Sequence, residues 1–160
     1  MKKVVACCGL LALLTVAPAF AYNGVDVAAV RRQAESGNPE SQSQLGVLYA
    51  SGVGIAQDKT EAVRWYGKSA EQGFPLGQWN LAFMYLRGEG GVKEDPAKAR
   101  ELFQQAADKG FAPAQYDLAM MYIFGIAGEP DREQAEKWLR RSAGQKYRAA
   151  EKKLAELLGR

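Results

Sequence analysis

Apolar residues recur at helical spacing through most of the chain. Leu45, Leu48 and Tyr49 stand three and four residues apart, so they share one face of a helix. The segment from Asp58 to Gly73 repeats this spacing with another set of apolar residues, and the stretch between the two is rich in glycine. The pattern predicts a hairpin, with a first helix of about 11 residues, a glycine-rich loop and a second helix of about 14 residues.

The hairpin pattern occurs three times in the same phase. A leucine followed by a small residue and, four positions on, a tyrosine marks each first helix, at Leu45, Leu81 and Leu118, and Leu154 begins a degenerate fourth copy. We expect repeats over 41–76, 77–113 and 114–149, with capping helices within 24–37 and 147–160. This organisation predicts seven helices, no strands and a single domain over 22–160.

Residues that start and stop helices stand at matching places in the repeats. The start of each second helix carries an aspartate suited to be its N-cap: Asp58, Asp95 and Asp131. Glu61 and Gln134 follow two of these by three residues, which is the spacing of a capping box. Gly73 and Gly110 should end their helices in the left-handed conformation, and Lys146 takes that place in the third repeat.

Small residues recur where neighbouring helices must approach closely. Gly46, Ala82 and Ala119 each follow the repeat leucine. Large residues on the second helices are in phase with the core, and we expect the following to be buried: Trp65, Tyr66, Phe103 and Trp138. One hairpin cannot bury its apolar face alone, whereas stacked hairpins form a continuous core. The sequence therefore predicts an all-α, right-handed solenoid of stacked helical hairpins.

These motifs, over roughly 41–145, resemble the Sel-one-like repeat family, which is related to tetratricopeptide repeats. The resemblance implies that a protein or peptide partner binds on the concave surface, which the first helices line. Its partner-facing positions and their polar neighbours form what we call the strip: Trp79, Asn80, Phe83, Leu86, Arg87, Tyr116, Asp117, Met120 and Ile123. An exposed apolar strip is typical of an interaction site. The alternative is that Phe83 and Met120 belong to the ordinary core, as helical apolar stripes usually do.

The first 21 residues have the features of a secretory signal peptide. Lys2 and Lys3 precede an apolar run over 4–16, and Ala19-Phe20-Ala21 offers small residues for cleavage after Ala21. The run is shorter than the roughly 20 residues that a membrane-spanning helix needs. We therefore expect an exported bacterial protein, periplasmic or secreted, with no membrane span after cleavage.

Composition argues against most kinds of chemistry. The chain has no histidine, and its two cysteines, Cys7 and Cys8, lie in the leader. The commonest general base, the thiol nucleophile and the best ligands for transition metals are therefore missing from the mature chain. We expect no catalytic residue, no metal site and no cofactor.

The net charge of the whole chain is +3, and it falls to about +1 without Lys2 and Lys3. Nucleic-acid binding would need a stronger basic face. Two functions remain for such a chain, and a hydrolase is the least expected alternative. One is an envelope adaptor that holds a partner in its groove, and the other is an inhibitor or immunity-type protein that occludes a secreted enzyme.

Overall fold

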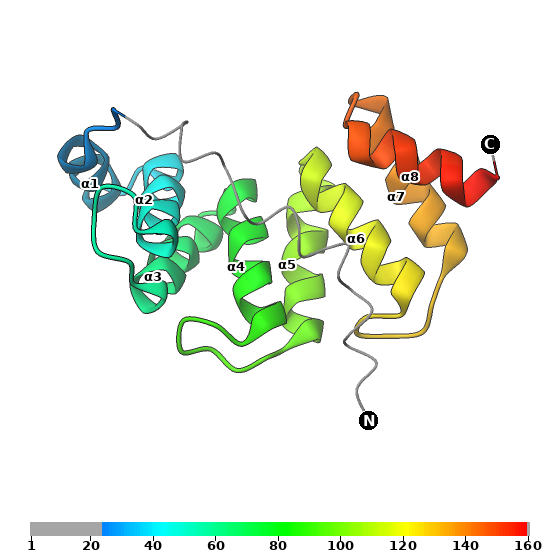
Figure 1. The fold of residues 1–160 in the computed structure, drawn as a ribbon, viewed down its shortest axis with the longest axis horizontal. Coiled ribbons are helices and arrows are strands. Elements are labelled where there is room, and N and C mark those ends of the chain that lie inside the picture. Colours follow the sequence, from blue (N-terminus) through cyan, green and yellow to red (C-terminus); the bar gives the residue numbers. More distant parts are fainter. Residues whose placement is uncertain (1–23, 160) are drawn as a thin grey trace.

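The computed structural model describes residues 24–159, which form eight helices and no strand. The helices follow one another along the long axis of the molecule (Figure 1). Their bounds are α1 Val27–Glu35, α2 Pro39–Ser51, α3 Lys59–Glu71, α4 Pro75–Arg87, α5 Pro96–Asp108, α6 Ala112–Phe124, α7 Arg132–Gly144 and α8 Arg148–Leu158. The predicted count of seven is wrong, because the three hairpins contribute six helices and the two expected capping helices, α1 and α8, bring the number to eight. The expected signal peptide lies outside the described residues.

The chain is an all-α solenoid of helical hairpins. Each of the six hairpin helices has 13 residues, so the first helices are longer than expected and the second ones slightly shorter. The first helices gain length at their N-termini. Pro39 and Pro75 open α2 and α4, and Pro113 stands in the first turn of α6. Proline is well suited to this place because its missing N–H has no helical partner there.

The aspartate N-caps of the second helices are confirmed. Asp58 Oδ1 accepts hydrogen bonds from the backbone N–H groups of Thr60 and Glu61, at 2.9 and 3.0 Å. The carboxylates of Asp95 and Asp131 accept equivalent bonds, each at 2.9 Å, from the N–H groups three residues later. These bonds satisfy N–H groups that have no partner inside the helix.

The reciprocal half of the expected capping box does not form. The backbone N–H of Asp58 donates to the carbonyl of Tyr49 at 2.9 Å, and Glu61 accepts hydrogen bonds from Arg64 instead. The same backbone bond recurs in the other two hairpins, from Asp95 to Tyr85 at 2.8 Å and from Asp131 to Tyr122 at 2.9 Å. It ties the end of each first helix to the start of the second one and closes the loop between them.

Glycines end the second helices as predicted, with one substitution in the third repeat. Gly73 and Gly110 have φ angles of 73° and 85°. Lys146 adopts the same left-handed conformation, with a φ of 62°, although it has a side chain. Ala127, in the third hairpin loop, also adopts the left-handed conformation, with a φ of 61°. It occupies the place of Gly54 in the first loop. A residue with a Cβ atom is strained in this region.

Close helix packing depends on glycines at two contacts. A Cβ atom at Gly46 would lie 2.5 Å from the ring of Tyr66, so α2 and α3 can approach only because that atom is missing. At Gly77 of α4 a Cβ would lie 2.5 Å from the Cβ of Ser69 on α3. The expected close approach at Gly46 is therefore confirmed, whereas the role of Gly77 was not predicted.

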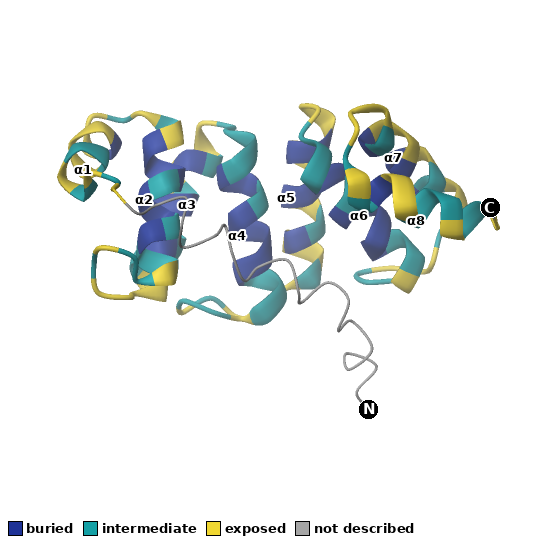
Figure 2. Ribbon diagram, turned by 45° about the horizontal axis from the view of Figure 1, so that its top comes forward, coloured by how far each residue is buried: buried dark blue, intermediate teal, exposed yellow. Residues whose placement is uncertain are grey.

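The core runs along the solenoid between its helices. Trp65, Tyr66, Phe103 and Trp138 are buried, as predicted. The main cluster extends from α3 to α8, and a smaller one joins α1, α2 and α3. Figure 2 shows the buried residues concentrated on the central helices, whereas α1 and the loops are largely exposed.

Buried glutamines link the repeats through hydrogen bonds. The Nε2 of Gln42 donates to the carbonyl of Ala34 at 3.1 Å, and its Oε1 accepts a bond of 2.7 Å from Gln72. Gln115 repeats both bonds at 3.0 and 2.8 Å, the second of them from Gln145. Each amide thus joins three consecutive helices and satisfies its own buried polar atoms.

Candidate partner-binding strip

The strip lies on two successive first helices, α4 and α6. Trp79, Asn80, Phe83, Leu86 and Arg87 belong to α4, and the rest belong to α6: Tyr116, Asp117, Met120 and Ile123. A hydrogen bond of 2.7 Å from Trp79 Nε1 to Asp117 Oδ2 joins the two sets. Trp79 and Asp117, which the sequence singled out in separate repeats, therefore meet between α4 and α6.

Four of the nine strip residues are buried rather than exposed. Phe83 and Met120 keep only 6% and 5% of their surface exposed, and Asn80 and Asp117 are also buried. Phe83 is covered because its ring packs edge-on against Phe103 of α5, with centroids 5.0 Å apart. The expectation that Phe83 and Met120 present an exposed apolar surface is therefore wrong, and these two side chains belong to the core.

The other strip residues remain partly accessible. Trp79 and Tyr116 are half-buried, and so are Leu86, Arg87 and Ile123. Trp79 also packs edge-on against Phe83, with the ring centroids 5.0 Å apart. The accessible part of the strip therefore consists of two aromatic side chains that rest on the core, with two aliphatic side chains and an arginine beside them.

Each accessible aromatic residue reaches the next first helix. The ring of Trp79 contacts Phe111 at 6.0 Å between centroids, and Tyr116 contacts Tyr147 at 5.7 Å. Phe111 and Tyr147 are the N-cap residues of α6 and α8. Sequence reasoning missed both, although an aromatic residue at the same place in successive repeats was a visible signal.

The polar residues that directly follow Trp79 and Tyr116 in the sequence also connect successive first helices. The Nδ2 of Asn80 donates to Ser43 Oγ of α2 at 3.4 Å, just as Asp117 accepts a bond from Trp79 of α4. In both cases the residue immediately before the repeat leucine pairs with the residue two before the leucine of the preceding repeat. Asn80 and Asp117 therefore connect adjacent first helices, which their sequence positions alone did not reveal.

Asp117 has an unusual electrostatic environment. Burial raises the pKa of its carboxyl group to about 7, although the hydrogen bond from Trp79 opposes this change. Burial also raises the pKa of the Tyr116 and Tyr147 hydroxyls, and the charge of Asp117 raises them further. The carboxyl group is therefore close enough to both phenols to affect their ionisation.

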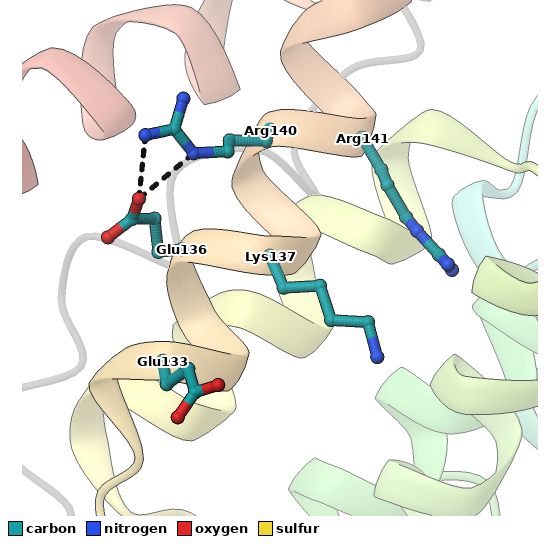
Figure 3. A pocket seen from close by; sticks show the side chains of 5 residues that line it. All are labelled: Glu133, Glu136, Lys137, Arg140 and Arg141. Atoms are coloured by element: carbon teal, nitrogen blue, oxygen red, sulfur yellow. Dashed lines mark hydrogen bonds and ion pairs between the residues drawn. The ribbon is translucent and has the colours of Figure 1, made fainter.

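The basic residues of α7 do not belong to the strip. In Figure 3, Arg140 turns toward Glu136, with an ion pair of 2.7 Å, whereas Lys137 and Arg141 extend to the other side of α7. The guanidinium of Arg141 lies over the ring of Trp138, 4.7 Å from its centroid. These cations therefore interact with groups of their own helix.

Residues 24–159 include no group of three or more histidine, cysteine or acidic side chains that could hold a metal ion. None of their helices has both the length and the apolar character needed to cross a membrane.

Comparison with known families decides the identity of the repeats. The Sel1 repeat pattern matches residues 39–74, 75–111 and 112–147, which together make up more than half of the chain. The chain belongs to the Sel1 repeat family. Sel1 repeat proteins are generally protein-interaction modules and are typically non-catalytic.

Two solved structures resemble this Sel1 repeat chain over 82% of its length. A Sel1 repeat protein from Oxalobacter formigenes is 35% identical, with a TM-score of 0.73, and the match covers 98% of that protein. A protective antigen present in uropathogenic Escherichia coli strains, which displays the same fold, is 37% identical, with a TM-score of 0.75. The Sel1 repeat chain spans only 28% of the length of that antigen.

A curated relative with Sel1-like repeats comes from Acanthamoeba polyphaga mimivirus. It is 38% identical over 56 residues, which are 35% of this chain and 10% of the viral protein. The Sel1 repeat chain thus corresponds to a small part of this relative and to almost all of the Oxalobacter protein.

Proposed function

We propose that this protein is a non-catalytic adaptor of the bacterial cell envelope, which holds a peptide or helix of a partner protein against the strip. The observation that carries the proposal is the pair of accessible aromatic side chains, Trp79 and Tyr116, on successive first helices. Each is fixed by a ring contact to the next first helix. Rigid aromatic side chains of this kind provide a large contact area at a low cost in conformational entropy.

The buried residues of the strip support this proposal in a second way. Phe83 and Met120 form a firm base under the accessible residues instead of contacting the partner themselves. The exposed part of the contact surface is therefore narrower than the sequence suggested, and its accessible residues are Trp79, Leu86, Arg87, Tyr116 and Ile123. A single extended peptide or one face of a helix matches such a narrow surface better than a broad globular interface does.

A binding experiment tests the proposal. Protein purified from the periplasm captures its partner from periplasmic extract, and affinity is then measured for Tyr116→Ala beside Tyr122→Ala. Both tyrosines lie half-buried on α6, but Tyr122 has the core phase of the repeat. We expect Tyr116→Ala to weaken binding by about 2 kcal/mol or more, whereas Tyr122→Ala lowers the melting temperature and leaves affinity nearly unchanged. Equal affinities for Tyr116→Ala and the unmodified protein would refute the strip as the contact surface.

The nature of the captured partner tests the adaptor role. If the partner is an enzyme whose activity falls to zero at equimolar Sel1 repeat protein, the adaptor proposal fails and an inhibitory role replaces it. A partner whose own activity is unchanged in the complex supports the adaptor.

Export is the remaining part of the proposal. It rests on the leader-like sequence before Tyr22, with its two lysines, apolar run and Ala-Phe-Ala ending. Mass spectrometry of the protein from fractionated cells should find Tyr22 as the N-terminus in the periplasm or the medium. A full-length chain in the cytoplasm would contradict the envelope location.

A further inference from the structure

The carboxyl group of Asp117 has no cation as a partner within residues 24–159. Its side chain is buried, with 6% of the residue's surface exposed, and among the described residues it accepts one hydrogen bond, from Trp79. All five ion pairs of the described chain involve glutamates: Glu61, Glu89, Glu101, Glu136 and Glu156. A buried carboxylate without a counter-charge is costly, because desolvation disfavours its ionised form.

Packing alone does not explain why this residue is acidic. Asn80 occupies the equivalent place in the preceding repeat and also bonds to the neighbouring first helix. An asparagine at 117 would have about the same volume, and its amide oxygen could accept the same bond from Trp79. The negative charge therefore adds a cost to folding that the fold does not require, which suggests that the charge serves binding.

The surroundings of Asp117 suit a cation. Trp79 contacts it directly, and Tyr116 and Tyr147 lie close enough for its charge to affect their hydroxyl groups. All three rings are half-buried and so keep part of their surface accessible. Arginine and lysine side chains bind favourably to aromatic faces, and the guanidinium of arginine also pairs well with a carboxylate. On α8, Lys153 pairs with Glu156 at 2.9 Å rather than with Asp117.

We propose that the strip recognises a basic side chain of the partner, an arginine or a lysine, which pairs with the carboxylate of Asp117 between the rings of Trp79 and Tyr116. This inference rests on the proposed function, because it assigns the chemistry of the partner at the same surface. A cation bound there would supply the counter-charge that the free protein lacks, and so would offset the desolvation of the carboxylate.

A displayed library of random twelve-residue peptides provides the test, with the purified protein as bait. We expect the selected peptides to share one basic position among apolar ones. A selected peptide is then synthesised with arginine and with citrulline, which keeps the shape and loses the charge. For the unmodified protein the citrulline peptide should bind at least about tenfold more weakly.

Asp117→Asn is the decisive variant, and Asp108→Asn is its control on the exposed face of α5. In Asp117→Asn the arginine and citrulline peptides should bind within about twofold of each other, whereas Asp108→Asn should keep the full difference. Circular dichroism confirms that both variants are folded. A tenfold difference that persists in Asp117→Asn would overturn the assignment of the site.

The remaining outcomes separate this inference from the proposed function. Peptides that bind the strip, lose affinity in Tyr116→Ala and share no basic position would refute the inference and leave the adaptor role intact. A library and a periplasmic capture that both yield no ligand sensitive to Tyr116→Ala would refute the proposed function and the inference with it.

Discussion

Asp117 is a buried carboxyl group whose ionisation lowers the stability of the folded protein, and it is also the residue proposed to bind the cation of the partner. Its pKa of about 7 lies above the value of roughly 3.9 expected for an unfolded chain. The folded protein therefore binds this proton more tightly than the unfolded chain does. Stability contributed by the neutral form is complete below about pH 4 and is lost as the pH rises toward 7.

The first prediction concerns this loss of stability with rising pH. Between pH 5 and pH 8 the unmodified protein should lose about 3 kcal/mol of stability relative to Asp117→Asn, because only the aspartate must ionise in its buried place. Urea unfolding of both proteins at the two pH values measures the difference. A constant difference between pH 5 and pH 8 would show that the carboxyl group titrates normally in the folded protein.

Backbone strain at single residues gives the second prediction. Ala127 has a φ of 61° in a loop position where the other repeats have glycine. Ala127→Gly should stabilise the protein by about 0.5–1 kcal/mol, since relief of the left-handed strain exceeds the added entropy of the unfolded chain. Ala155→Gly, within α8, is the control and should destabilise by about as much. Thermal melting measures the stability of both variants. If the two substitutions shift the melting temperature in the same direction, the account of strain is refuted.

At the scale of the elements, helix contacts are set by single missing side chains. Gly77 and Gly67 both lie within helices, yet their surroundings are opposite. A Cβ atom at Gly77 would lie 2.5 Å from the Cβ of Ser69 and 3.0 Å from the backbone nitrogen of Ala70. A Cβ atom at Gly67 would have no neighbour within 4 Å.

The third prediction compares alanine at these two positions. Gly77→Ala should cost about 1–3 kcal/mol, because α3 and α4 must separate to accommodate the methyl group. Gly67→Ala should stabilise α3 by up to about 1 kcal/mol, since alanine has the higher helix propensity and space is free. Chemical unfolding of the two variants provides the comparison. A stabilising Gly77→Ala would mean that the α3–α4 contact is looser than described.

The elements were largely predictable from sequence, whereas the contacts between repeats were not. Helical spacing and the N-cap aspartates depend on residues close in sequence, so Asp58 and Asp131 could be assigned directly. The bond between Trp79 and Asp117 joins residues 38 positions apart, and it depends on the distance between α4 and α6. Phe83 has the same spacing as an exposed strip residue, and only the edge contact with Phe103 reveals that it is core.

At the scale of the whole molecule, each helix packs mainly on its immediate neighbours in sequence. In such a linear array, stability is approximately a sum of repeat and interface contributions. The terminal helices then serve as caps. Leu154 and Leu157 of α8 pack against the main core, whereas Glu151 and Lys152 face solvent.

The last prediction concerns removal of the C-terminal cap. Deletion of residues 147–160 uncovers the sides of α6 and α7 that α8 covers, and it removes the ring of Tyr147 from Tyr116. Amide hydrogen exchange should therefore become faster in α6 and α7, while α2 and α3 keep most of their protection, because no contact with α8 supports them. The full chain is the reference. Lys152→Ala changes only the exposed face of α8 and is the control, so its amide hydrogens should exchange as slowly as those of the full chain. Equal loss of protection in all helices would mean that the solenoid unfolds as one unit, and the nearest-neighbour account of its stability would be wrong.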